Sequence, residues 1–182
     1  MEFKEKEIVL KDGNICVLRS PKEQDAVAIL ELLKITAGET SYLIRYPEEV
    51  TMTLEEEQKF LKNILESKLN LMICAFVNGE LAGNAGIHCV REHLKVKHRA
   101  RFGIGIKQKF WNKGIGNALM KELLNAAKEM GFEQLELEVF SGNTRAISLY
   151  KKYGFEVWGT VKNACKLKDG TYFDELVMGR FL

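Results

Sequence analysis

Lys107-Gln-Lys-Phe-Trp-Asn-Lys-Gly-Ile-Gly-Asn-Ala-Leu119 follows a strand-like run at residues 100–106 and leads into a helix-like run at residues 117–130. The turn between the two runs contains Gly114 and Gly116. A small-residue turn that opens a helix directs free backbone N–H groups and the positive end of the helix dipole outward. Such a turn holds phosphate, and glycine lets a ligand touch the backbone. The stretch therefore predicts a phosphate-binding turn. Lysines nearby would add to the attraction, at positions Lys107, Lys109 and Lys113.

The same glycine pair also fits a plain strand-to-helix turn beside solvated lysines. A Walker A loop is excluded, because Gly116 is followed by Asn117 and Ala118 instead of Lys and then Ser or Thr. A dinucleotide fingerprint requires a glycine or alanine where Leu119 stands, although Glu136 lies about twenty residues further on, as that fingerprint asks. Because the chain is strand-rich on both sides of the turn, the dinucleotide site stays a minor alternative.

The composition is that of a soluble globular protein, which we expect to form one domain spanning residues 1–182. Hydrophobic residues make up 46% and charged residues 29% of the chain. A net charge of +2 provides no general attraction to nucleic acid or to a membrane, so neither is expected as a partner. Any anion site must therefore come from a local cluster of cations.

Cysteine spacing and the N-terminal residues favour a cytoplasmic location. The cysteines lie at positions 16, 74, 89 and 165 without a C-x-x-C pair, which is typical of reduced thiols. The charged N-terminal residues lack the apolar stretch of a signal peptide, and no apolar run is long enough to span a membrane. No metal site is expected, because His88, His93 and His98 share no helical face and no cysteine accompanies them at zinc spacing.

Hydrophobic periodicity and turn residues predict the order strand-strand, helix-helix, three strands, helix, strand, helix, strand-strand. The expected strands are 8–10, 15–19, 71–77, 80–91, 97–106, 133–140, 155–162 and 171–179. The expected helices follow Ser20 and Thr53, span 114–130, and run from 141–144 through Tyr153. This order predicts an α/β (α+β) domain with a mixed, mostly antiparallel sheet.

Local signals mark several element ends. Ser20 is expected to cap the first helix, with Glu23 completing a capping box. Thr53 is expected to cap the second helix in the same way, with Glu56. Asn78-Gly79 predicts a two-residue hairpin turn. Apolar spacing predicts the buried face of the second helix to be Phe60, Leu61, Ile64 and Leu65.

Two motifs resemble those of the GCN5-related N-acetyltransferase (GNAT) family. Asn143-Thr-Arg-Ala-Ile-Ser-Leu-Tyr-Lys-Lys-Tyr-Gly-Phe155 resembles the family's Asn-x-x-Ala-x-x-Leu-Tyr-x-x-x-Gly-Phe motif, and residues 110–119 resemble its acetyl-CoA pyrophosphate loop. The order of elements also matches, so the resemblance covers nearly the whole chain. Residues 169–178 look like the branch that contains ribosomal-protein and small-amine acetyltransferases. The resemblance implies a GNAT-like single domain in which helices flank the sheet and a splayed strand pair binds acetyl-CoA.

The loop departs from the family pattern at one position, because the family usually has Gln or Arg where Trp111 stands. By the resemblance, Lys113 or Lys109 would replace this charged anchor. The residues implied for acetyl-CoA binding are Phe102, Ile104, Ile106, Trp111, Asn112, Lys113, Gly114, Ile115, Gly116, Asn117, Asn143, Ala146 and Tyr150.

Some of these residues have a structural alternative. The backbone N–H near Ile104 is the expected oxyanion donor. Gly103 and Gly105 would let the ligand approach the strand, or they mark a bulge. Asn143 would contact the pantetheine arm or hold a water there, and helix capping is equally consistent with its position.

Tyr150 is implied as the general acid that protonates the departing thiolate, since a phenol has a pKa close to that of a thiol. Tyr153, three residues later, is expected in the core. The general base stays open between Glu138, Glu39, His88 and a chain of waters, because each side chain also fits a solvated or core-edge role.

The sequence thus predicts a cytoplasmic N-acetyltransferase that transfers an acetyl group from acetyl-CoA to a primary amine by direct attack in a ternary complex. The amine belongs to a small molecule or a peptide N-terminus, and residues 36–50 and 162–172 are expected to build its pocket. The alternative is a non-catalytic acyl-CoA-binding or sensor module on the same fold. A homodimer is also expected, because exposed strand edges in this fold often pair.

Overall fold

One mixed sheet organises the computed structural model, which describes residues 1–182. Its eight strands lie in the order β1-β2-β3-β4-β5-β6-β8-β7. The strands are β1 (Lys6–Val9), β2 (Ile15–Arg19), β3 (Asn70–Val77), β4 (Glu80–Cys89), β5 (Arg99–Ile106), β6 (Gln134–Phe140), β7 (Glu156–Lys166) and β8 (Tyr172–Phe181). The helices are α1 (Ala26–Glu39), α2 (Leu54–Glu66), α3 (Ile115–Glu129) and α4 (Thr144–Lys152). The predicted fold class and order of elements are confirmed.

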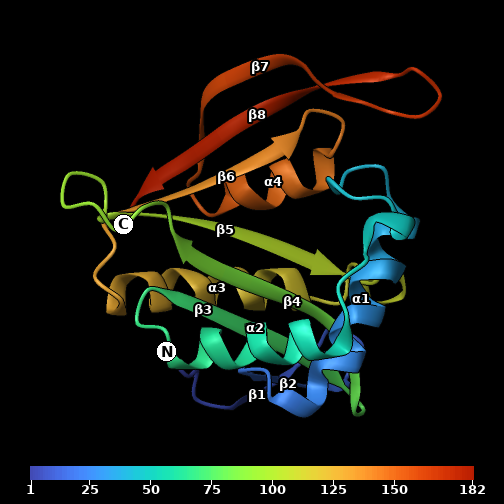
Figure 1. Ribbon diagram of the computed structural model, residues 1–182, viewed down its shortest axis with the longest axis vertical. Helices are drawn as coiled ribbons and strands as arrows, with labels where there is room; N and C mark the ends of the chain where they lie inside the picture. The colour runs from blue at the N-terminus through green and yellow to red at the C-terminus, as the bar shows by residue number, and fades with distance from the viewer.

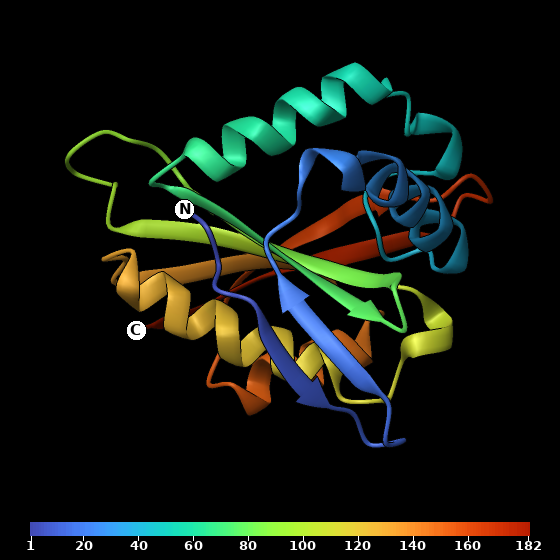
Figure 2. The ribbon, with the colours of Figure 1, turned by 90° about the horizontal axis from the view of Figure 1, so that it is seen from below.

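The helices form a layer on each face of the sheet. Figures 1 and 2 show α1 and α2 covering one face and α3 and α4 covering the other. The larger core cluster, of 26 buried residues, lies between α3 and the sheet, and a second cluster of eight lies under α1 and α2. No helix in the structure has both the length and the apolar character needed to cross a bilayer.

Local signals predicted some element ends correctly and others wrongly. Thr53 and Glu56 exchange the expected capping bonds, at 3.2 and 2.8 Å. Asn78 and Gly79 both have positive φ, 51° and 80°, in the β3–β4 turn. The predicted Ser20 cap is wrong, because its hydroxyl accepts the N–H of Phe3 and α1 begins only at Ala26.

Helix α2 also buries a different face from the predicted one. Leu61 and Ile64 are buried as expected, but Phe60 is 42% exposed and Glu57 is only 1% exposed. Helix α2 packs against both α1 and β3, so the packing partners rather than apolar spacing decide which residues face inward.

Strands β5 and β6 are the only parallel neighbours, and they pair over a short distance. Their register contains only Arg99↔Gln134, Ala100↔Leu135 and Arg101↔Glu136. Beyond these pairs the strands diverge toward the end of the sheet where α1 and α4 lie (Figure 1). The splayed strand pair is therefore confirmed, and it leaves a split in an otherwise continuous sheet.

A carboxylate holds the closed end of this split. Glu136 is 3% exposed and accepts hydrogen bonds from Arg99 at 2.5 and 2.8 Å and from Gln134 at 2.7 Å. Burial alone would raise the pKa of Glu136, but these hydrogen bonds outweigh it and the pKa lies below the usual value. Where β5 and β6 still pair, they are therefore held together by the Arg99–Glu136 ion pair as well as by backbone hydrogen bonds.

Candidate active site

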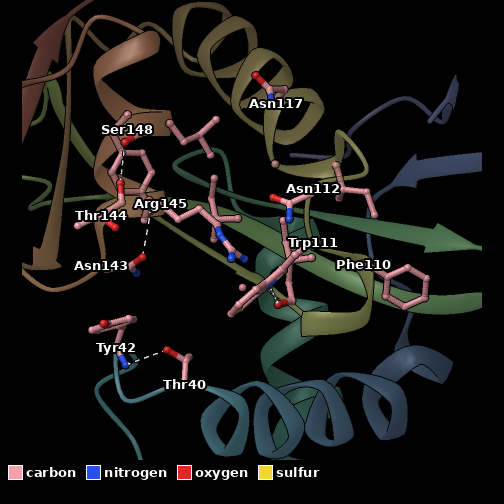
Figure 3. A pocket seen from close by; sticks show the side chains of 18 of the residues that line it. Thr40, Tyr42, Phe110, Trp111, Asn112, Asn117, Asn143, Thr144, Arg145 and Ser148 are labelled. Carbon is pink, nitrogen blue, oxygen red and sulfur yellow. Dashed lines mark hydrogen bonds between the residues drawn. The ribbon is translucent and has the colours of Figure 1, made fainter. Parts of the chain in front are cut away.

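A cavity of about 540 Å³ lies in the split between β5 and β6. Its walls come from β5, the turn before α3, the first turn of α3, helix α4 and the chain after α1. Of the residues implied for acetyl-CoA, all but Phe102 and Lys113 line it. Phe102 lies beneath the cavity, buried against the rings of Tyr150 and Phe155, and Lys113 points elsewhere. Figure 3 shows the labelled side chains around this space.

The turn before α3 has the backbone shape that an anion requires. Asn112 and Gly114 adopt left-handed conformations, with φ of 63° and 104°. No backbone N–H from 112 to 114 donates to another group of the chain. The next three N–H groups belong to the first turn of α3 and have no acceptor within the helix. Together they form a concave set of free donors at the positive end of a helix.

Gly116 makes this turn accessible for a second reason. A Cβ at that position would lie 3.3 Å from Leu149 of α4 and 3.6 Å from Ile106 of β5. Both residues line the cavity, so a glycine at position 116 keeps space free beside them.

The lysines expected to add charge to this turn are each paired with a carboxylate. Lys107 and Lys109 both bind Glu80, at 2.8 and 2.6 Å, and Lys113 binds Asp12 at 2.9 Å. None of the three lines the cavity. The cations that do line it are Lys11, Arg145 and Lys152, none of which has a carboxylate partner. Arg145 could have been found from sequence, because it lies inside the Asn143 motif.

Strand β5 places a free N–H in the split. Val90 donates its N–H to the Arg99 carbonyl, and Lys107 donates its N–H to the Ala82 carbonyl. The backbone N–H and C=O groups of the odd-numbered residues of β5 therefore point toward β4. Antiparallel alternation then turns the N–H of Ile104 toward the split, where β6 has already diverged. The β4–β5 register runs without interruption, so the alternative that the strand's glycines mark a bulge is wrong.

Helix α4 presents Asn143 and Tyr150 to the cavity from one face, as their spacing of about two turns requires. The Asn143 side-chain oxygen accepts the N–H of Ala146 at 3.2 Å, so the capping role is confirmed. That bond leaves the Asn143 amide N–H₂ free for the cavity.

Tyr150 is 8% exposed, and its ring packs edge-on against Phe102 with centroids 5.6 Å apart. No group of the chain hydrogen-bonds its hydroxyl. Burial raises the pKa of Tyr150 to about 12, so the phenol holds its proton at neutral pH. A protonated, unpartnered hydroxyl on a cavity wall can donate to a ligand atom.

The half-buried ring of Tyr153 packs against the edge of the larger core cluster, and its hydroxyl donates to the Asn117 carbonyl at 2.8 Å. Lys152 donates to the Asn117 side chain at 2.5 Å. These two bonds connect the end of α4 to the first turn of α3.

The opposite face of the sheet carries titratable residues from neighbouring strands. Arg101 binds Glu138 at 3.0 Å, and His88 is its register partner on β4. Glu175, which sequence reasoning missed, pairs in register with Phe140 and so shares the Glu138 face. It forms no hydrogen bond or ion pair within the chain.

Burial and charge shift two of these groups. Burial, reinforced by the charge of Glu138, raises the pKa of Glu175, although Arg101 opposes the shift. Burial and Arg101 lower the pKa of His88. A carboxyl with a raised pKa and no partner is better suited to accept a proton than one paired with arginine.

Glu39 does not take the position expected of a base. It is the last residue of α1 rather than part of a loop, it does not line the cavity, and its carboxylate accepts the N–H of Gln108 at 2.6 Å. This bond fastens α1 to the short turn that follows β5.

The two segments predicted to build the acceptor pocket meet each other. The ring of Tyr42 lies edge-on to Phe173, one residue beyond the second segment, with centroids 5.7 Å apart. The Tyr46 hydroxyl accepts the N–H of Lys168 at 2.9 Å, and the Lys168 side chain forms an ion pair with Glu48. The chain after α1 is thus joined to the β7–β8 hairpin beside the mouth of the cavity. No group of three His, Cys, Asp or Glu residues could hold a metal ion.

Comparisons with known proteins agree with this geometry. A model of the acetyltransferase (GNAT) family matches residues 34–155. An L-amino acid N-acetyltransferase of Escherichia coli (strain K12) is 36% identical over 109 residues, which are 59% of this chain and 66% of that relative. An acetyltransferase of the GNAT family from Streptococcus pneumoniae superposes with a TM-score of 0.87 at 27% identity, covering 92% of this chain and 99% of that one. A ribosomal-protein-alanine N-acetyltransferase from Brucella melitensis gives 0.79 at 25% identity, over 91% and 99%.

Proposed function

The chain belongs to the acetyltransferase (GNAT) family of acetyl-CoA-dependent N-acetyltransferases, and from this premise we propose that it acetylates a primary amine by direct attack within a ternary complex. The observation that carries the proposal is the Tyr150 hydroxyl, which is protonated, unpartnered and on the wall of the same cavity as the free N–H groups of the turn before α3. A donor for a leaving thiolate and a cradle for a pyrophosphate therefore share one space.

The residues present fit acetyl-CoA, which supplies the acetyl group as a thioester. The free N–H groups at 112–117 would hold the pyrophosphate, and β5 would lie along the pantetheine arm. The Asn143 amide would donate to that arm. The Ile104 N–H would stabilise the oxygen that becomes negative when the amine nitrogen bonds to the acetyl carbon. Tyr150 would then give its proton to the sulfur as the carbon–sulfur bond breaks.

The amine must lose a proton to attack, and we assign its acceptance to the carboxylates Glu138 and Glu175. Both lie on the sheet face opposite α3, next to the point where β5 and β6 separate. Glu175 is the better acceptor, because it has no partner and its pKa is raised. Glu39 has no part in this proposal, since its carboxylate is bound to the backbone elsewhere.

The acceptor is assigned to amines next to a carbonyl-bearing carbon, as in amino acids and peptide N-termini. Support comes from two relatives, whose names describe acetylation of L-amino acids and of a ribosomal-protein alanine. The aromatic rings of Tyr42 and Phe173 beside the carboxylate face offer an apolar surface for the rest of such a substrate.

The test is release of free CoA from acetyl-CoA with amino acids, N-terminal peptides, polyamines and aminoglycosides as acceptors. Gly116→Val is expected to raise the KM for acetyl-CoA by at least ~10-fold, because its side chain would narrow the cavity. Gly159→Val is the matched control, since a Cβ there meets nothing within 4 Å. Binding of acetyl-CoA by calorimetry without turnover on any amine would favour the non-catalytic module instead.

A further inference from the structure

The phosphates of acetyl-CoA need positive charge, and the structure removes the nearest lysines from that role. Lys107, Lys109 and Lys113 are each held by a carboxylate outside the cavity. The charge must come from cations that line the cavity itself. Lys11 lies beside Gly114, and Lys152 is bound to the Asn117 side chain. Arg145, in the first turn of α4, is the cation that stacks on Trp111 in the turn before α3.

The Arg145 side chain extends from α4 to the Trp111 ring in the turn before α3. Its guanidinium carbon is 3.9 Å from the centre of the Trp111 ring, and Figure 3 shows the side chain extending toward that ring. Trp111 is in turn fixed, because its indole N–H donates to the Ile106 carbonyl at 2.7 Å. The arginine is therefore held in an extended position by a rigid partner.

A stacked guanidinium uses its flat face and keeps its edge free. No carboxylate, carbonyl or amide of the chain accepts a hydrogen bond from Arg145. The five N–H donors therefore lie in one plane, oriented by Trp111 and available to a ligand. A planar fork of this kind matches two phosphate oxygens, and the stacking lowers the entropy lost when it binds them.

We propose that Arg145, stacked on Trp111, binds the pyrophosphate of acetyl-CoA from the α4 side while the backbone N–H groups at 112–117 bind it from the α3 side. This inference rests on the proposed function, because it names the residue that recognises the charged part of the same co-substrate. It assigns Trp111 the part of a positioning residue, which acts through Arg145 rather than by its own charge.

The experiment measures binding of CoA and of 3′-dephospho-CoA by calorimetry, since both carry the pyrophosphate and only CoA carries the 3′-phosphate. R145Q is expected to weaken both ligands by at least ~10-fold. K151Q is the matched control, because it removes the same charge from an exposed position of the same helix and is expected to change either affinity less than ~2-fold. Thermal unfolding of each free variant checks that the fold is retained.

The positioning role of Trp111 has its own readout in a double-mutant cycle. W111L is expected to weaken CoA binding in the parent chain and to have a smaller effect in the R145Q background, because the stacked partner is already gone. Equal effects in both backgrounds would mean that Trp111 does not act through Arg145.

Two results would overturn the assignment. If R145Q weakens CoA but not 3′-dephospho-CoA, Arg145 binds the 3′-phosphate and not the pyrophosphate. If R145Q binds both ligands as the parent does, Arg145 has no phosphate role, while the proposed function stands. If the parent chain itself binds no CoA, the proposed function fails.

Discussion

Tyr150 combines a raised pKa with a free hydroxyl, so it remains a proton donor throughout the pH range in which an amine can be deprotonated. Tyr150→Phe removes the donor and keeps the ring that packs on Phe102. We expect kcat to fall by at least ~10-fold, about 1.4 kcal/mol of transition-state stabilisation, with the affinity for acetyl-CoA within ~2-fold of the parent. Single-turnover kinetics with a saturating amine measures the step directly.

Tyr153→Phe is the control for this prediction. It also removes a hydroxyl from α4, but that hydroxyl donates to the Asn117 carbonyl and not into the cavity. We expect an unchanged kcat and a decrease of about 1 kcal/mol in the free energy of unfolding. A Tyr150→Phe variant with the parent's kcat across the pH range would show that water or another group protonates the thiolate.

For single residues, the sequence predicted positions that depend on a local pattern. It did not predict contacts between residues that are far apart in the chain. Gly114, found from the local glycine pattern, and Asn143, found from the family motif, both line the cavity. The ion pairs of the lysines could not be predicted, because Glu80 and Asp12, which bind them, are far away in the sequence. Glu175 was missed because nothing near it in the sequence indicates that it shares a face with Glu138.

Among the elements, α2 carries a charged residue in its buried face. Glu57 is 1% exposed, and its Oε1 atom has no hydrogen-bond partner. Burial raises the pKa of Glu57 above its unfolded value of ~4.3. The native state therefore binds the proton more tightly, so the stability that this carboxyl contributes is complete below the unfolded pKa and is lost as the pH rises through the folded pKa.

Glu57→Met is expected to raise the free energy of unfolding at pH 7 by about 1 kcal/mol or more, with a smaller gain at pH 4, because the unsatisfied carboxylate is removed. Urea unfolding at several pH values measures both numbers. Glu55→Gln, on the exposed side of the same helix, should follow the parent. A gain that is equal at pH 4 and pH 7 would show that the pKa of Glu57 is the same in the folded and unfolded states.

Element ends illustrate which signals are sufficient in the sequence. The Thr53 box and the Asn78-Gly79 turn are closed by bonds within a few residues, so the sequence alone specifies them. Serine is a common helix cap, but the pairing of β1 with β2 places Phe3 next to Ser20. The Ser20 hydroxyl therefore accepts the Phe3 N–H instead of capping a helix. Tertiary contacts of this kind decide between equivalent local choices.

For the molecule as a whole, the decisive feature is the short junction between β5 and β6. Glu136→Gln keeps the size of the side chain and removes the charge that binds Arg99. We expect the free energy of unfolding to fall by about 1–3 kcal/mol, the range for a half-screened buried pair. Glu133→Gln, exposed one residue before β6, is the control. An unchanged free energy of unfolding in Glu136→Gln would show that backbone hydrogen bonds alone hold β5 and β6 together.

The overall arrangement was predictable in part. Periodicity and turns specified the order of helices and strands, because each depends on residues close in the chain. The position of β8 between β6 and β7, and the place where β5 and β6 separate, depend on pairings between distant segments. Only the resemblance to a family, carried by the Asn143 motif, indicated the split.

The split also divides the ligand's contacts between two lengths of chain. Residues 1–131 hold β5 and the turn before α3, while residues 132–182 hold Asn143, Arg145 and Tyr150. The exposed turn at Gly131 separates these two lengths. If the chain were cut there, acetyl-CoA would contact both fragments and make all of its contacts only in the reassembled complex. It would therefore stabilise that complex without a covalent bond. Mass action then makes fragment reassembly about 100-fold tighter at a ligand concentration of about 100 times Kd, and the severed protein becomes a reporter of acetyl-CoA concentration.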